Sequence, residues 1–193
     1  MIRALYDWTL KLAQSKGAPK ALGVISFAES SVFPIPPDTL LIPMVIADRS
    51  KWFRYALLCT IASVLGAFAG YAIGALAYEW VGKPVLEFYG KSDGFEKITS
   101  WYNEYGGWGV LFAAVTPFPY KVVTIFSGVT GLNLLVFTVV SLIGRSLRFF
   151  LVAFLLYKFG EPIQTFIEKR LNLVFFAGVV LLIGGFAAIR FLG

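Results

Sequence analysis

The sequence predicts an all-α integral membrane protein with three full transmembrane helices and two opposed re-entrant helical hairpins, arranged as an inverted repeat with interfacial amphipathic helices. Of its 193 residues, 58% are apolar and 15% are charged. Soluble domains have about 45–50% apolar and about 25% charged residues. The mean hydropathy of +0.76 points the same way. The length fits one domain, so we expect residues 1–193 to form a single membrane domain.

The first part of the chain predicts an interfacial helix followed by a re-entrant hairpin. Residues 1–20 alternate apolar and charged positions at helical spacing, which is typical of a helix lying in the membrane interface. Residues 21–47 are apolar but are interrupted by Pro34, Pro36 and Pro37. A helix does not continue through three prolines in four residues. The flanks, 21–33 and 39–47, are also shorter than the about 20 residues of a full span, so we expect both arms to enter and leave on one side.

A full span and a polar segment come next. Residues 52–78 form the first full span, in which Gly66, Gly70 and Gly74 are four residues apart. Small residues at that spacing allow close helix packing in lipid, either within the chain or in a homo-oligomer. Residues 79–107 are polar on the whole and carry one aromatic stripe, so we expect a second amphipathic helix on the outer side.

The second half of the chain repeats this order. Residues 108–133 are split by Pro117 and Pro119 into two short apolar pieces, which predicts a second hairpin. Residues 134–157 and 171–192 are long enough for two further full spans. A cytoplasmic loop over residues 158–170 connects these two spans.

The positions of lysine and arginine favour the re-entrant arrangement. With two re-entrant hairpins, the N-terminal segment, the 48–54 loop and the 158–170 loop share one side, which then carries ten Lys and Arg residues against four on the other. The positive-inside rule places the richer side, and the N-terminus, in the cytoplasm. One kinked span over 21–47 would instead put two basic segments on opposite sides. The net charge of +6 is explained by this topology and by anionic lipid headgroups, without nucleic acid.

The two proline breaks align at a constant offset of 83 residues. Val32, Pro34, Pro36 and Asp38 fall on Val115, Pro117, Pro119 and Lys121. A full span follows each copy, and the two copies start from opposite sides, which predicts an inverted repeat. Inverted repeats with broken helices place a binding site near the membrane midplane.

Five ionisable residues lie inside the apolar segments: Glu29, Asp38, Lys121, Arg145 and Arg148. Each costs roughly 2.5–3.5 kcal/mol at a helix centre, so they must pair with one another or face water. Arg145 and Arg148 are three residues apart on one helix face and could clamp a phosphate, together with Lys121. Glu29 and Asp38 would take up a proton or serve as charge partners. A closed ion-pair network without transport, or an ion pathway, would explain the same residues.

Two absences from the sequence narrow the chemistry. There is no histidine, and Cys59 is the single cysteine, which excludes Ser-His and Cys-His nucleophile pairs and a Cys-based metal site. We therefore expect no metal, no cofactor and no enzyme activity.

The sequence resembles the DedA superfamily, whose domain is also called VTT or SNARE-associated, and is most similar to its YqaA branch. The likeness is carried by Glu29, Phe33–Asp38, Gly66 and Gly70, and Thr116–Lys121. It implies two opposed re-entrant hairpins and lipid translocation. Bacterial relatives are associated with undecaprenyl phosphate recycling and the proton motive force, and eukaryotic relatives are phospholipid scramblases. Where many relatives have two arginines in the second hairpin, this chain has Thr116 and Val122, with Lys121 as the one cation.

These observations predict a flippase- or scramblase-like transporter of the bacterial inner membrane that moves a phosphate-bearing lipid, such as undecaprenyl phosphate or a phospholipid. Membrane lipids with anionic headgroups would be its partners. The alternatives are a structural protein of the envelope and a proton-coupled transporter of small solutes or ions.

Overall fold

The computed structural model describes residues 15, 17–33, 35–88, 92–116 and 118–160. These residues form helices and no β-strand. The elements are α2 (Ala18–Ser31), α3 (Asp38–Ala47), the short 3₁₀ helix η1 (Arg49–Lys51), α4 (Trp52–Ala77), the π-helical segment η2 (Tyr78–Gly82), α5 (Lys83–Phe88), α6 (Ser92–Val115), α7 (Tyr120–Val129) and α8 (Leu134–Phe159). Most of the interfacial helix expected at 1–20, the third span expected at 171–192, Pro34 and Pro117 lie outside the described residues.

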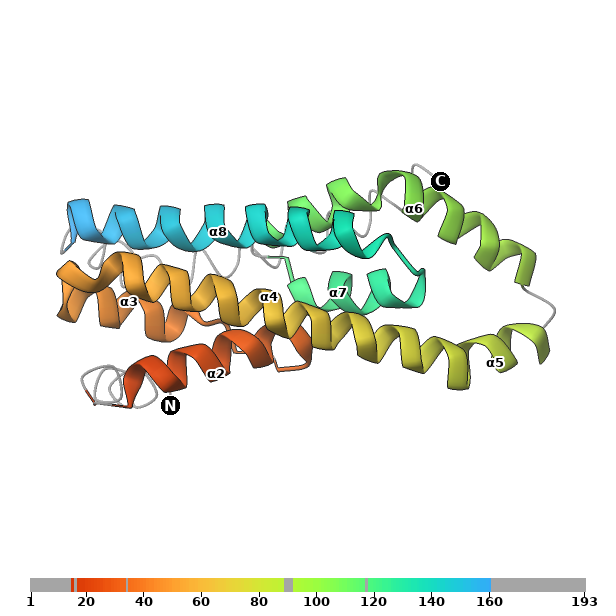
Figure 1. Cartoon of the computed structure of the whole chain (residues 1–193), viewed down its shortest axis with the longest axis horizontal. Helices are drawn as coiled ribbons and strands as arrows, with labels where there is room; N and C mark the ends of the chain where they lie inside the picture. The colour runs from red at the N-terminus through yellow and green to blue at the C-terminus, as the bar shows by residue number, and fades with distance from the viewer. Residues whose placement is uncertain (1–14, 16, 34, 89–91, 117, 161–193) are drawn as a thin grey trace.

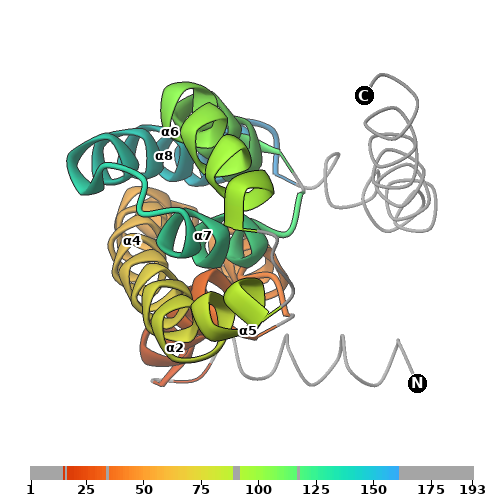
Figure 2. The same ribbon diagram turned by 90° about the vertical axis from the view of Figure 1, so that its right-hand side faces the viewer.

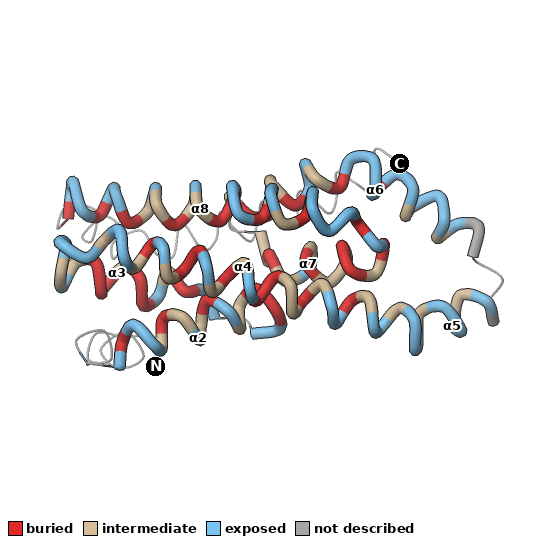
Figure 3. The backbone as a smooth tube through the Cα atoms, viewed as in Figure 1, coloured by how far each residue is buried: buried red, intermediate tan, exposed pale blue. Residues whose placement is uncertain are grey.

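The two longest apolar helices are α4 and α8, which lie side by side and run in opposite directions (Figure 1). Both are long and apolar enough to cross a membrane, each with a mean hydropathy of 2.0 over its most apolar stretch. They match the spans predicted at 52–78 and 134–157. Their outer faces carry exposed leucine, isoleucine and phenylalanine side chains, and their buried residues face the other helices (Figure 3).

Each proline break separates two helices that reverse direction about midway along the bundle (Figure 1). In the first, α2 ends at Ser31 and α3 begins at Asp38, directly after Pro37. In the second, α6 ends at Val115 and α7 begins directly after Pro119. Proline suits these positions because the first residues of a helix need no backbone donor and its ring already fixes φ near the helical value.

The helix order repeats along the chain. The starts of α3 and α7 are 82 residues apart, as are the starts of α4 and α8, and the ends of α2 and α6 are 84 apart. The offset of 83 read from the prolines lies between these values. The members of each pair run in opposite directions along the bundle (Figure 1), so the repeat is inverted in the described part of the chain.

No helix boundary separates the segments expected at 79–107 and 108–133. One continuous helix, α6, runs from Ser92 to Val115 and carries both the aromatic stripe and the first arm of the second hairpin. Gly106 and Gly107 do not end it, because a glycine inside a helix costs only up to about 1 kcal/mol relative to alanine. Both glycines also lie where a side chain would meet a neighbour, Tyr102 and Val136 respectively.

Helix α4 packs through its glycines against both hairpins. A Cβ atom added at Gly66 would overlap the backbone of Phe27 in α2, and one at Gly74 would overlap the backbone of Ile125 in α7. Gly70 lies between them, against the carbonyl of Ser30 and the side chain of Thr124. The view along the bundle shows α4 beside both α2 and α7 (Figure 2). The glycine face of α4 therefore serves contacts within the chain.

Candidate functional site

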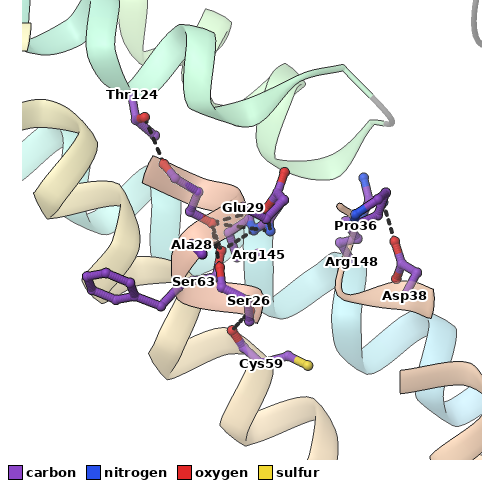
Figure 4. A network of polar contacts seen from close by, with 12 residues as sticks. Ser26, Ala28, Glu29, Pro36, Asp38, Cys59, Ser63, Thr124, Arg145 and Arg148 are labelled. Carbon is purple, nitrogen blue, oxygen red and sulfur yellow. Dashed lines mark hydrogen bonds and ion pairs between the residues drawn. The ribbon is translucent and has the colours of Figure 1, made fainter. Parts of the chain in front are cut away.

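Four of the five charged residues singled out in the sequence gather where the two hairpin turns meet the middle of α4 and α8 (Figure 4). Helix α2 contributes Glu29 near its C-terminal end, and α3 contributes Asp38 at its first residue. Helix α8 contributes Arg145 and Arg148 from consecutive turns. Four of the five charges expected to converge thus form two ion pairs.

The inner ion pair joins Arg145 to Glu29. Nη2 of Arg145 donates to Oε2 of Glu29 over 2.6 Å, and Nε donates to Oγ of Ser63 over 2.5 Å. The guanidinium also lies over the rings of Tyr120 and Phe149, 4.6 and 4.7 Å from their centroids. Arg145 is only 1% exposed. Its charge is therefore balanced by a carboxylate and enclosed by two aromatic rings.

A chain of hydroxyl groups supports the inner pair. The Oγ atoms of Ser30 and Ser63 are 2.6 Å apart, and Oγ of Ser30 also donates to Glu29 over 3.2 Å. Oγ1 of Thr124 donates to the carbonyl of Ser30 over 3.0 Å. These bonds connect α2, α4 and α7, so the position of Glu29 is fixed by three helices.

The outer ion pair joins Arg148 to Asp38. Nη2 of Arg148 donates to Oδ2 of Asp38 over 2.6 Å, and Nη1 donates to the carbonyl of Thr116 over 2.5 Å. One guanidinium therefore holds the start of α3 and the turn after α6, which are the tips of the two hairpins. The side chains of Arg148 and Asp38 are 18% and 19% exposed, so this pair is more accessible than the inner one.

Lys121 stands apart from these pairs. It lies in the first turn of α7 and is partly exposed. Among the described residues, its side chain forms no salt bridge and no hydrogen bond. The sequence predicts that all five charged residues converge, and four of them do so in the described structure.

Three buried polar atoms near the ion pairs have no hydrogen-bond partner among the described residues. They are Oδ1 of Asp38, Oη of Tyr120 and Oγ of Ser141. Buried polar atoms are nearly always hydrogen-bonded. The middle of the bundle therefore has hydrogen-bonding capacity that its own described side chains do not use.

A cavity in the described part of the chain lies away from the ion pairs. It has a volume of about 510 Å³ and opens between the C-terminal end of α4, the first half of α6 and the end of α7, with Glu79, Glu96 and Asn103 in its wall. None of the five charged residues lines it, so it does not belong to the ion-pair site.

A family model described as the VTT domain matches residues 35–158. The chain belongs to the VTT domain family. This is the DedA family that the sequence resembles. The match includes nearly all of both long helices and four of the five charged residues singled out in the sequence, with Glu29 before its first residue.

Full-length relatives of this VTT domain protein occur in other bacteria. An uncharacterized protein of Haemophilus influenzae is 34% identical over 177 residues, which is 92% of each chain. A second uncharacterized protein, from Histophilus somni and named as a homologue of HI0703, is 32% identical over 179 residues, or 93% of each chain. The undecaprenyl phosphate transporter A of Staphylococcus aureus is 28% identical over 126 residues, covering 61% of this chain and 62% of that protein. No solved structure matches the chain.

The VTT domain structure adds residues that the sequence reasoning missed. Ser30 and Ser63 hydrogen-bond to the inner pair, and Tyr120 covers the Arg145 guanidinium. The sequence contained a signal for Ser30, because Ser26 and Ser30 are one helical turn apart and Ser30 directly follows Glu29. The carbonyl of Thr116 could not be found in this way, since any residue at that position provides one.

The signs of the charges follow the repeat. Both carboxylates, Glu29 and Asp38, come from the first repeat, and both arginines come from the second. Each ion pair of the site therefore joins one repeat of the VTT domain to the other.

Proposed function

We propose that this protein is a transporter that moves a phosphate-bearing lipid, such as undecaprenyl phosphate or a phospholipid, across the bacterial inner membrane. The observation that carries the proposal is the position of two ion pairs midway along a bundle whose helices α4 and α8 are long enough to span a bilayer. Charges at that depth are costly and are typical of transport pathways. Close packing by small residues would hold the hairpins more cheaply, and α4 already provides it.

The membrane arrangement we propose has α2–α3 and α6–α7 as re-entrant hairpins from opposite sides, with residues 171–192 as a third span. Irregular backbone at the depth of the two turns must be buried in protein or line a water-filled cavity. Val32 and Phe33 of the first turn are 61% and 44% exposed in the described structure, so this turn would line such a cavity. The end of the bundle where α4 begins and α8 ends carries Lys20, Arg49, Lys51, Arg54 and Lys158 against Asp48 among the described residues. The opposite end has more glutamates than lysines. The positive-inside rule then places the basic end, and the N-terminus, in the cytoplasm.

The two arginines would take different parts in transport. Arg148 is partly exposed and offers the planar fork of donors that suits a phosphate group. An entering phosphate would compete with Asp38 for Arg148, and protonation of Asp38 would favour the exchange. Lys121 would add a second positive charge at the tip of the other hairpin. Arg145, being enclosed, would hold Glu29 and the first hairpin in place.

The name of the Staphylococcus aureus relative favours a lipid phosphate as the substrate class. The competing candidate is a structural protein of the envelope, which is favoured by the fact that both arginines are fully paired. A proton-coupled transporter of small solutes or ions is the third reading of the same charges.

The test is headgroup-resolved lipid movement in liposomes, with and without a pH gradient. Arg148→Gln should lower the rate by about 30-fold or more, because it removes the charged partner of the phosphate. Asp38→Asn should also lower the rate, because no carboxylate remains to displace the phosphate from Arg148. Lys97→Gln removes an exposed positive charge away from the site and is the matched control. A pH-gradient effect that Asp38→Asn abolishes would support proton coupling.

Three outcomes would contradict the proposal. Wild-type rates in folded Asp38→Asn and Arg148→Gln would remove the ion pair from the pathway. A Glu29→Gln variant that unfolds more easily but moves lipid normally per folded molecule would favour the structural protein. Solute or ion flux that is independent of the lipid headgroup would favour the third reading.

A further inference from the structure

An aromatic cluster joins α4 and α8 at the basic end of the bundle. The ring of Trp52 stacks on Tyr157 with centroids 5.6 Å apart and meets Phe154 edge-on at 5.7 Å. Phe53 meets Phe150 edge-on at 5.1 Å. The first turn of α4 is thereby packed against the last three turns of α8 (Figure 1).

One side of this cluster packs against the core through Trp52 and Phe150, and the other side is exposed. The side chains of Phe53, Phe154 and Tyr157 are 52%, 42% and 45% exposed. Tryptophan and tyrosine prefer the boundary between lipid and water. Because the rings contact one another, they form a fixed apolar surface near the start of α4 and the end of α8, at the depth where we expect lipid acyl chains to begin.

Three cations without a carboxylate partner in the described structure lie at the edge of this aromatic cluster. Arg54 and Lys158 follow Phe53 and Tyr157 directly in the chain, and Arg49 lies over Gly160, just after the end of α8. All three are exposed, and the described part of the chain gives none of them a carboxylate partner. The neighbouring Lys51 differs, because it is paired with Asp48 at 2.5 Å.

The opposite end of the bundle provides a comparison within the same molecule. Trp80, Trp101 and Trp108 are 79%, 63% and 75% exposed there. Exposed aromatic residues thus occur at both ends. The residues around the second set include Glu79, Glu96 and Glu104 as well as Lys83 and Lys97. Among the described residues, aromatic rings therefore combine with a net positive charge only where α4 begins and α8 ends.

We propose that this surface, formed by the Trp52 cluster with Arg49, Arg54 and Lys158, is a binding site for an anionic phospholipid of the surrounding leaflet. The headgroup phosphate would contact the three cations, and the first part of an acyl chain would lie on the rings. Charge complementarity selects an anionic headgroup over a zwitterionic one. The site is separate from the Arg145 and Arg148 ion pairs, so it stands whether or not the protein transports lipid.

The test uses the full chain in vesicles of phosphatidylcholine containing brominated phosphatidylglycerol or, in parallel, brominated phosphatidylcholine. Bromine quenches nearby tryptophan, and the difference between wild type and Trp52→Phe isolates the signal of Trp52. We expect brominated phosphatidylglycerol to quench Trp52 at a lower mole fraction than brominated phosphatidylcholine. Arg54→Gln should lower this preference roughly fivefold, and Arg49→Gln/Arg54→Gln/Lys158→Gln should abolish it.

The control variant is Lys83→Gln/Lys97→Gln, which removes two exposed cations from the other end and should keep the preference. Native mass spectrometry of the same variants counts retained phosphatidylglycerol and is independent of fluorescence. Equal quenching by the two brominated lipids, or a preference that survives the triple substitution, would overturn the proposal. Equal loss in the control variant would do so too, because it would show only an effect of total charge.

Discussion

We expect Glu29→Gln to lower the free energy of unfolding by about 3–5 kcal/mol, because it leaves a buried arginine without its counter-charge. The burial of Arg145 is the reason to expect a loss of this size. Arg145 is 1% exposed and enclosed by Tyr120 and Phe149, so water cannot replace the lost carboxylate. Asp38→Asn should cost less, about 1–2 kcal/mol, because that pair is 18–19% exposed and Arg148 keeps its bond to a backbone carbonyl.

The assay is reversible unfolding in mixed micelles with increasing denaturing detergent, followed by circular dichroism and tryptophan fluorescence. A loss of 3 kcal/mol is about a 150-fold change in the folding equilibrium, which such curves resolve. The double variant Glu29→Gln/Arg145→Gln should cost at least about 2 kcal/mol less than the sum of its parts, since it buries no unpaired charge. The reasoning is refuted if Glu29→Gln costs no more than Asp38→Asn, or if the two single losses add.

Three further changes test packing, pH dependence and burial. Gly74→Ala should destabilise the protein by about 1–3 kcal/mol because its Cβ would overlap the backbone of α7. Gly109→Ala, with open space around it, should stabilise the protein by up to about 1 kcal/mol. Thermal unfolding that ranks the two variants the other way would contradict this reasoning. Hydrogen bonds from Lys51 and Ser50 hold the pKa of Asp48 below its ordinary value of 3.8, so Asp48→Asn should lower the melting temperature at neutral pH. Its difference from wild type should vanish as the pH falls through the lowered pKa, and a constant difference down to pH 2 would argue against the bond. Cys59 is fully buried, so a maleimide should label it only after unfolding, and mass spectrometry showing rapid labelling of the folded protein would place it at the surface.

The sequence predicted the helical breaks and long spans well because both depend on local chemistry. Clustered prolines mark where a helix is interrupted, and long apolar runs mark the two candidate spanning helices. Helices α3, α4 and α8 therefore begin within one residue of the expected positions, and α7 begins directly after Pro119. The missed feature was the continuity of α6. The change from polar to apolar residues at 107/108 suggested a boundary, but the helix continues through it, and Gly107 there packs against Val136, a residue distant in sequence.

The site shows the same division between local and distant information. Glu29, Asp38, Arg145 and Arg148 stood out because charges are rare in apolar segments. Which carboxylate meets which arginine depends on the depth at which each hairpin turns, and the sequence does not encode that depth locally. The same holds for Lys121, which the alignment of the two repeats placed opposite Asp38 but which forms no ion pair in the described structure.

The division of charges between the repeats also governs how the protein is made. Glu29 precedes Arg145 by 116 residues and Asp38 precedes Arg148 by 110. At a synthesis rate of about 5–20 residues per second, the carboxylates enter the membrane roughly 6–23 s before their arginines exist. During this interval the nascent first repeat must keep its carboxylates protonated or in contact with water or the insertion machinery. A chain that stalls before α8 lacks both arginine partners, so incomplete synthesis leaves the first repeat with two uncompensated carboxylates.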